Sequence, residues 1–414
     1  MPDAYLPRLA ESVLFPALDS FPAISVVGPR ATGKTTTASR FAGSILRLDR
    51  SEEEQVVRAD PDAAIRRGIA PVLIDEWQVV PEVLGAVKRR VDDASGPGQY
   101  LITGSVRADL DVATWPGTGR VLRIPMWGLT TRERLRRLGD GVGLVDRLVD
   151  GGIAALDRGA PHLDIDGYLS EVLVGAFPFP ATELDVVGRE RWYESYLDQV
   201  MTRDAAMLGE ARDPVRLRRY FETCAIHTGS VLDDATLYRA AGVDRRTAVA
   251  YEHLLSGLSL IDHLPAWWTN RLKRLTQRPK RFVVDPALAA AALRVDQGAI
   301  LRDAGILGRL LETFAVAQLR AESNPSTSRY RLHHLRTEQG RHEVDVIAEL
   351  GGGRVVGIEV KAAAAVNTTD ARHLRWLADE LGDRFVAGVV LHTGSHTFEL
   401  GDNIVAAPIS SLWA

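Results

Sequence analysis

Two short segments near the start of the chain combine residue types that act on phosphates. Residues 28–35 read GPRATGKT and fit the phosphate-binding loop G-x-x-x-x-G-K-[ST]. Residues 72–76 read VLIDE, an apolar run that ends in two acids. Loop amides and Lys34 would cradle phosphates, while Thr35 and Asp75 would hold Mg²⁺ from two sides. The two segments in this order predict a nucleoside-triphosphate site with ATP and Mg²⁺ as cofactors.

The flanking residues support this interpretation over a chance glycine-rich turn. Residues 23–27 read as a strand, and residues 36–42 can open a helix whose N-terminus meets the phosphates. Glu76, next to the metal acid, is placed to polarise the attacking water. The residues expected to contact the nucleotide are those of the loop: Gly28, Pro29, Arg30, Ala31, Thr32, Gly33, Lys34, Thr35 and Thr36.

Two further polar positions fit an ATPase sheet. The segment 99–103 reads as a strand, and Thr103 or Ser105 at its end would sense the γ-phosphate, although an ordinary strand-end turn is the alternative. Arg120 would act as an arginine finger on a neighbouring subunit, which implies a homo-oligomer. A solvated surface arginine is the alternative for Arg120.

Composition restricts the class of protein. The chain has 414 residues, 46% hydrophobic and 25% charged, enough for two or three domains. A single cysteine, Cys224, excludes an intramolecular disulfide and a cysteine-cluster metal site. No segment looks like a signal peptide or a membrane span, so a cytoplasmic protein is expected. The net charge of −4 means that nucleic acid would need a local basic patch.

The order of patterns predicts an α/β protein with three parts. Strands are expected at 23–27, 45–48, 71–74, 99–103 and 121–125, alternating with helices, and an amphipathic helix is expected before them. This pattern indicates a parallel sheet covered on both faces. The expected domains are an ATPase domain (1–150), a helical region (151–300) with a winged helix at about 230–285, and a small α/β domain (301–414).

The motifs GPRxxGKT, IDEWQ, LITGS and GR, in this order, resemble a prokaryotic group of AAA-type ATPases. In that group, the ATPase domain is followed by a C-terminal domain of unknown function. Later segments that start at Phe177 and Tyr196 are also similar, so the resemblance covers nearly the whole chain. It implies an AAA-type P-loop core and ATP binding.

Residues 235–251 have the rhythm of a helix-turn-helix. The first helix would end at Gly242, and Asp244 would cap a second helix that runs to about Gly257. Arg245 and Arg246 would then lie where recognition helices meet DNA. A basic run follows, with no acid among its members: Arg271, Lys273, Arg274, Arg278, Lys280 and Arg281. The module would bind nucleic acid, DNA rather than RNA being favoured, or serve only as a packing lid.

The C-terminal segment carries an acid and an acid-x-lysine pattern. Glu359 and Lys361 alternate along one strand and face one side, and Asp345 would lie on a neighbouring strand across the glycines 351–353. This arrangement resembles the PD-(D/E)XK nuclease fold. The resemblance implies that Asp345 and Glu359 bind Mg²⁺, with Glu312 completing the site, and that Lys361 stabilises the transition state. A simple ion pair between Glu359 and Lys361 is the alternative.

These observations leave three hypotheses. The first is an ATP-dependent enzyme that binds nucleic acid and cleaves phosphodiesters with Mg²⁺. The second is a nucleotide-switched DNA-binding regulator with an inactive nuclease fold. The third is a signalling or toxin–antitoxin ATPase with a protein target, which burial of the basic run would favour. The sequence favours the first hypothesis, with the second next.

Overall fold

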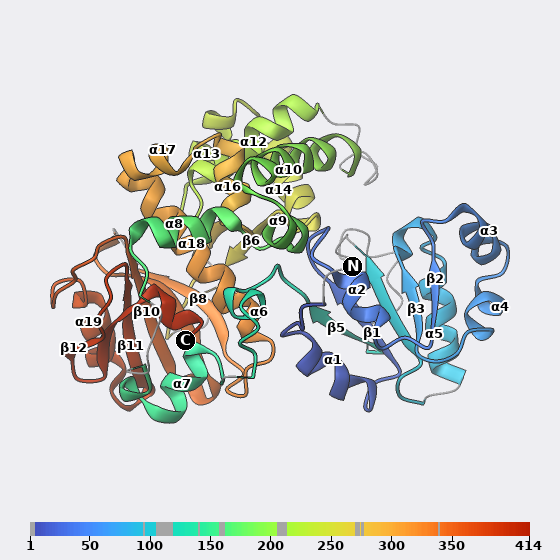
Figure 1. Cartoon of the computed structure of the whole chain (residues 1–414), viewed down its shortest axis with the longest axis horizontal. Helices are drawn as coiled ribbons and strands as arrows, with labels where there is room; N and C mark the ends of the chain where they lie inside the picture. Colours follow the sequence, from blue (N-terminus) through green and yellow to red (C-terminus); the bar gives the residue numbers. More distant parts are fainter. Residues whose placement is uncertain are drawn as a thin grey trace. The chain divides into compact units, whose positions relative to one another are not determined.

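The chain folds into two compact units. The computed structural model describes residues 5–93, 96–104, 119–139, 141–156, 162–204, 213–269, 274, 277–337 and 340–414. Unit 1 comprises Met1–Leu129 with His253–Leu260, and unit 2 comprises Thr130–Glu252 with Ile261–Ala414 (Figure 1). Each unit is built around its own sheet.

Unit 1 contains a parallel five-stranded sheet, whose strands run from blue to teal in Figure 1. Its central strand is hydrogen-bonded to parallel neighbours on both sides. All five strands start and end within one residue of the predicted ranges. In spatial order they are β2 (Ser44–Arg47), β3 (Val72–Asp75), β4 (Tyr100–Gly104), β1 (Ala23–Val27) and β5 (Val121–Pro125).

Helices cover both faces of this sheet, as the alternating pattern predicted. Ile24 and Leu73 point into a core that also contains Leu14 of the N-terminal helix. The neighbouring Ala23 and Ile74 point into the opposite core, because successive strand residues face opposite sides. The helices are α1 (Glu11–Leu18), α2 (Lys34–Ser39), α3 (Ser51–Ala59), α4 (Pro61–Arg66), the short η1 (Trp77–Val79) and α5 (Val83–Asp93).

The first two helices of unit 2, α6 (Thr131–Arg134) and α7 (Leu144–Gly151), are followed by a short turn of helix, η3 (Ile153–Leu156). Arg132 forms an ion pair of 2.9 Å with Glu322, and both side chains are at most 6% exposed. The Thr131 amide donates to Gln318 at 2.8 Å. These contacts fix α6 to the long helix α18 (Ala304–Ser323).

The middle of unit 2 is helical, as predicted. A cluster of aromatic rings joins two of its helices, with Phe177 packed on Trp192 and Tyr196. In the described parts of the chain, no helix is both long and apolar enough to cross a membrane. The helices are α8 (Ile165–Val174), α9 (Pro178–Glu183), α10 (Val186–Gln199), a π-helical turn η4 (Val200–Asp204), α12 (Pro214–Ile226), α13 (Asp234–Ala241), α14 (Arg245–Gly257), α16 (Pro286–Leu293) and α17 (Gln297–Arg302).

The segment from α13 to the next strands has the predicted order of elements. Helix α13 ends at Gly242, whose φ of 67° suits glycine. The Asp244 carboxylate accepts the Thr247 amide at 3.0 Å and so caps α14. Strands β6 (Ile261–Leu264) and β7 (Lys280–Val283) then pair antiparallel.

The C-terminal part of unit 2 is built on a mixed six-stranded sheet. Strands β9 (Glu343–Glu349) and β10 (Val355–Lys361) pair antiparallel across the glycine turn η6 (Gly351–Gly353), as predicted. Strand β10 then pairs in parallel with β11 (Phe385–His392). Helix α19 (Arg372–Leu381) packs its leucines on one face. Short helical turns η7 (Gly382–Arg384) and η8 (Ile409–Leu412) lie between and after the later strands. In spatial order the strands are β12 (Phe398–Gly401), β13 (Ile404–Pro408), β11 (Phe385–His392), β10 (Val355–Lys361), β9 (Glu343–Glu349) and β8 (Arg331–Arg336).

Cys224, the single cysteine, lies on α12 and is only 3% exposed. Burial raises the pKa of its thiol far above the ordinary value, and the negative charge of Glu252 adds to this effect. The side chain therefore serves as a small apolar residue of the helical core.

Candidate nucleotide and acid-cluster sites

The loop 28–35 turns tightly through three residues with positive φ, two of which are glycines. Gly28 has φ 156°, and a Cβ there would lie 2.0 Å from the Met126 carbonyl oxygen. Gly33 has φ 89°, in the left-handed region, directly before α2. Ala31 also adopts a positive φ, of 62°. Strand β1, the loop and α2 therefore form the predicted strand–loop–helix unit.

Lys34 lies inside this loop and is 7% exposed. Its ammonium donates to the carbonyl oxygens of Gly28 at 3.0 Å and Pro29 at 2.6 Å. Burial lowers the pKa of Lys34 to about 8, against the opposing effect of the acids Glu76 and Asp75. The loop thus surrounds a desolvated cation, the arrangement that favours a phosphate anion.

Asp75 joins the two halves of the site. Its Oδ1 accepts hydrogen bonds from the Thr35 hydroxyl and from the Thr103 hydroxyl, both at 2.7 Å. The carboxylate is 6% exposed at the end of β3. A buried carboxylate beside a threonine hydroxyl fits Mg²⁺, which prefers oxygen ligands. Thr35 and Asp75 are the residues that would hold the metal.

Glu76 follows Asp75 in the left-handed conformation, with φ 55°. This conformation turns the chain out of β3, and the Gln78 amide donates to the Glu76 carboxylate. Trp77 is buried beneath, where a Cβ on Gly104 would come within 2.5 Å of its indole nitrogen. Trp77 therefore packs in the core of unit 1.

Of the two proposed sensors of the γ-phosphate, Thr103 contacts Asp75, whereas Ser105 lies outside the described residues. Arg120 pairs with Asp92 of its own unit. This hydrogen bond lowers the pKa of Asp92. The role of Arg120 toward a neighbouring subunit stays a prediction.

Arg8 is a supporting residue that the sequence did not reveal. Its guanidinium is 5% exposed and donates to the carbonyl oxygens of Thr32 at 2.7 Å and Trp127 at 2.9 Å. The Tyr5 hydroxyl donates to the Glu11 carboxylate at 2.6 Å, and the Thr37 hydroxyl lies 2.9 Å from the Tyr5 oxygen. These contacts brace the phosphate loop and α2 from the N-terminal segment. No local pattern marks the contacts of Arg8, since its two partners are 24 and 119 residues away.

Arg245 and Arg246 are exposed at the start of α14, as predicted. Arg219 of α12 is also exposed and lies beside the turn before α14, because a Cβ on Gly242 would be 3.4 Å from its Nη1. Three arginines therefore approach the start of one helix. The sequence reasoning missed Arg219, which lies outside the helix-turn-helix pattern.

The members of the basic run that the structure describes are paired or buried, and so are not free to contact nucleic acid in the way the sequence suggested. Arg274 donates to both oxygens of Glu349 at 2.7 Å, so its charge is compensated within the chain. Arg281 pairs with Glu252 at 2.7 Å and with Asp234 at 2.6 Å. Arg278 pairs with Asp233 at 2.9 Å, Lys280 is buried, and Arg271 and Lys273 lie outside the described residues. The acids come from distant segments, which is why the run looked uncompensated.

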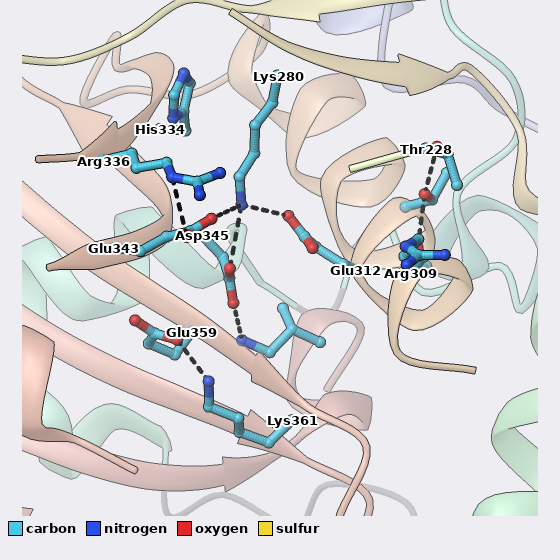
Figure 2. Close-up of polar contacts among 12 residues, drawn as sticks. Thr228, Lys280, Arg309, Glu312, His334, Arg336, Glu343, Asp345, Glu359 and Lys361 are labelled. Atoms are coloured by element: carbon cyan, nitrogen blue, oxygen red, sulfur yellow. Dashed lines mark hydrogen bonds and ion pairs between the residues drawn. The ribbon is translucent and has the colours of Figure 1, made fainter. Parts of the chain in front are cut away.

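Lys280 enters the predicted acid cluster (Figure 2). Its ammonium lies 2.9 Å from Glu312, 3.2 Å from Asp345 and 3.5 Å from Glu343. Burial disfavours this charge, but the three carboxylates outweigh it and hold the pKa of Lys280 above its ordinary value. Burial raises the pKa of Glu312 to about 8, although Lys280 opposes the change.

Glu359 and Lys361 form a separate pair beside this cluster. The Lys361 ammonium donates to Glu359 at 2.8 Å, and Asp345 accepts the Val360 amide at 3.0 Å (Figure 2). Burial and the charge of Asp345 raise the pKa of Glu359 well above its usual range, despite Lys361. The Glu359 Oε1 atom is buried without a hydrogen-bond partner.

This arrangement does not fit the expected Mg²⁺. Asp345 and Glu359 each contact a different lysine, so both charges are already compensated. Among the described residues, no group of three or more histidines, cysteines or acids is arranged to hold a metal. We derive no metal-dependent step for Asp345, Glu359, Glu312 or Lys361.

Comparisons with known proteins agree with the ATPase site. Residues 20–135 match the family model described as AAA domain. Residues 165–299 and 307–412 match two domains of unknown function, DUF8612 and DUF4143. These matches confirm the predicted order of an AAA-type ATPase domain followed by a C-terminal domain of unknown function. The N-terminal domain is thus of the class that binds and hydrolyses ATP, typically with Mg²⁺.

Similar full-length proteins carry no assigned activity. Uncharacterized proteins of Mycobacterium bovis and Mycobacterium tuberculosis are each 28% identical over 411 residues, which is 98% of this chain and 84% of theirs. A Walker-type ATPase of Pyrococcus abyssi aligns with a TM-score of 0.42 and 14% identity, over 71% of this chain and 97% of its own.

Proposed function

We propose that this protein is an Mg²⁺-dependent ATPase that binds nucleic acid through the start of α14 and acts as a nucleotide-controlled regulator. The observation that carries the proposal is Asp75, which receives hydrogen bonds from Thr35 of the phosphate loop and from Thr103 of the next strand. One carboxylate therefore links the loop to the strand that would sense the γ-phosphate.

The residues of unit 1 have separable tasks in hydrolysis. When ATP enters, the Lys34 ammonium exchanges the carbonyl oxygens of Gly28 and Pro29 for phosphate oxygens. Mg²⁺, when bound to Thr35 and Asp75, neutralises charge on the phosphates. Glu76 orients a water for in-line attack and accepts its proton. Gln78, which donates to the Glu76 carboxylate, holds Glu76 in position until the substrate is bound.

Nucleic-acid binding is proposed for the exposed arginines at the start of α14. Arg245, Arg246 and Arg219 place positive charge near a helix N-terminus, where backbone amides also favour phosphate. The proposal no longer rests on the basic run, because Arg274 and Arg281 are paired with acids. The C-terminal sheet would then serve binding or regulation without metal-dependent cleavage.

A signalling ATPase with a protein target is the second candidate. The burial of Lys280, which is 1% exposed, and the pairing of Arg281 favour it, since both remove charge from the proposed nucleic-acid surface. The two candidates predict different salt dependence of the binding affinity. Contacts with nucleic-acid phosphates release counterions, so that affinity falls steeply with salt, whereas binding to a protein releases far fewer ions.

ATP turnover, measured with and without duplex DNA, tests the proposal. The wild-type protein should hydrolyse ATP and respond to DNA. Glu76→Gln should bind ATP but lose about 10²-fold or more in rate. Arg245→Ala with Arg246→Ala should keep basal turnover and lose the response to DNA. A control with two exposed arginines elsewhere in unit 2, Arg191→Ala with Arg302→Ala, should change neither.

Each part of the proposal can fail by itself. Wild-type turnover in Glu76→Gln would refute the role of Glu76. An equal response to DNA in the Arg245→Ala and Arg246→Ala double variant, with an unchanged salt slope of binding, would leave the protein-target candidate.

A further inference from the structure

The side chain of Lys280 is buried against elements other than the strand that carries it. Lys280 begins β7, the second strand of the antiparallel pair after α14, yet its side chain is 1% exposed and leaves that pair. Its partners are Glu312 on α18, and Glu343 and Asp345 on β9. Figure 2 shows the ammonium between these three carboxylates. One lysine thus joins the β6–β7 pair to the C-terminal sheet.

The positive charge of Lys280 offsets the negative charge of the carboxylates that surround it. Glu312, Asp345 and Glu343 each lie within 3.5 Å of the Lys280 ammonium, and carboxylates this close to one another would repel wherever they are ionised. Two further cations lie nearby: the half-exposed Arg336 is 3.7 Å from Glu343, one of the three carboxylates, and Lys361 contacts Glu359. His334 is buried close by, and burial and the charge of Lys280 lower its pKa to about 4, so it is neutral.

We propose that Lys280 is a tethered cation that fills the acid cluster in place of a divalent metal, so that the cluster stays closed to metal while β7 is docked. An ammonium and a divalent ion only a few ångströms apart would repel, and the oxygens that a metal needs are already used by Lys280. Withdrawal or neutralisation of Lys280 would leave Glu312, Asp345 and Glu343 facing a shared space. This inference concerns unit 2 alone and stands whether or not the protein hydrolyses ATP.

Uptake of Mn²⁺ by the nucleotide-free full-length chain, followed by the paramagnetic signal of the free ion, tests this inference. Mn²⁺ accepts the same oxygen ligands as Mg²⁺. Lys280→Met should gain one Mn²⁺ site that is at least about tenfold tighter than any site of the wild type, because a nearly isosteric apolar side chain removes only the charge. Asp345→Asn in the Lys280→Met background should remove the gain. The phosphate loop is the same in all these proteins, so the differences report on the acid cluster.

Lys280→Arg and the wild type supply the controls. Lys280→Arg keeps a fixed positive charge and should gain no Mn²⁺ site. A folded Lys280→Met protein that takes up no more Mn²⁺ than the wild type would overturn the proposal, and so would a gain that survives Asp345→Asn.

Loss of folding in Lys280→Met would not end the test. Lys280→Gln keeps amide donors for the carboxylates and is the milder neutral variant. If neither variant folds, Mn²⁺ uptake is compared between the wild type and the single variant Asp345→Asn. Equal Mn²⁺ uptake by the two supports a cluster closed to metal, whereas a wild-type site that Asp345→Asn removes overturns the proposal.

Discussion

Replacing Lys34 with methionine should stabilise the nucleotide-free protein while abolishing ATP binding. Lys34 is desolvated inside the phosphate loop, and its pKa falls from 10.5 to about 8. At about 1.36 kcal/mol per unit, this shift of about 2.5 units corresponds to a cost of about 3 kcal/mol in the folded protein. The hydrogen bonds to Gly28 and Pro29 offset about 1 kcal/mol each. The net gain expected for Lys34→Met near pH 7 is therefore about 1 kcal/mol.

The gain should depend on pH in a defined direction. Below pH 8, Lys34 is charged in both folded and unfolded chains, and the full cost is present. Between about 8 and 10.5 the unfolded chain binds more protons, so wild-type stability rises with pH relative to Lys34→Met. In the wild type, ATP should raise the melting temperature of one unfolding transition, which identifies the transition of the ATP-binding unit. Calorimetry of this transition at several pH values measures the difference in stability between the wild type and Lys34→Met. A Lys34→Met protein that is no more stable than the wild type, or whose advantage is the same at all pH values, would refute the reasoning.

Three further predictions concern other contacts. Gly28→Ala should lose ATP binding with little change in secondary structure, because its Cβ would lie 2.0 Å from the Met126 oxygen; an ATP titration by fluorescence checks this. Arg132→Ala leaves Glu322 buried and alone, and should destabilise unit 2 by about 3–5 kcal/mol in urea, whereas the exposed control Arg58→Ala should cost under about 1 kcal/mol. Asp244→Ala removes the cap of α14 and should cost about 1 kcal/mol, measured by the same unfolding assay.

The nucleotide site could be predicted from the sequence because its chemistry is local. The loop 28–35 is contiguous, and Asp75 and Glu76 directly follow an apolar run that can only be a buried strand. Parallel strands then bring Thr103 to the same edge of the sheet. The hydrophobic pattern and the loop motif, both of which are short-range, therefore predicted the strands and the side chains that meet at their ends.

The acid cluster could not be predicted in the same way. Asp345, Glu359 and Lys361 were found from strand alternation, but Lys280 was assigned to a basic run that would contact nucleic acid. Its partners are 32 and 65 residues away, and nothing in the local pattern reveals that its side chain turns inward. Arg274 and Glu349, 75 residues apart, show the same limit. Charge pairing between distant elements is a property of the packed chain.

Because Cys224 is buried, thiol-reactive labels would attach only to cysteines that are introduced at the surface. The chain has one thiol, and its high pKa and 3% exposure leave almost no thiolate to react with a maleimide. Cysteines introduced at exposed positions such as Glu52 in unit 1 and Arg191 in unit 2 would therefore carry a donor and an acceptor dye without background. Energy transfer between them would follow the separation of the two units through each cycle of ATP binding and release.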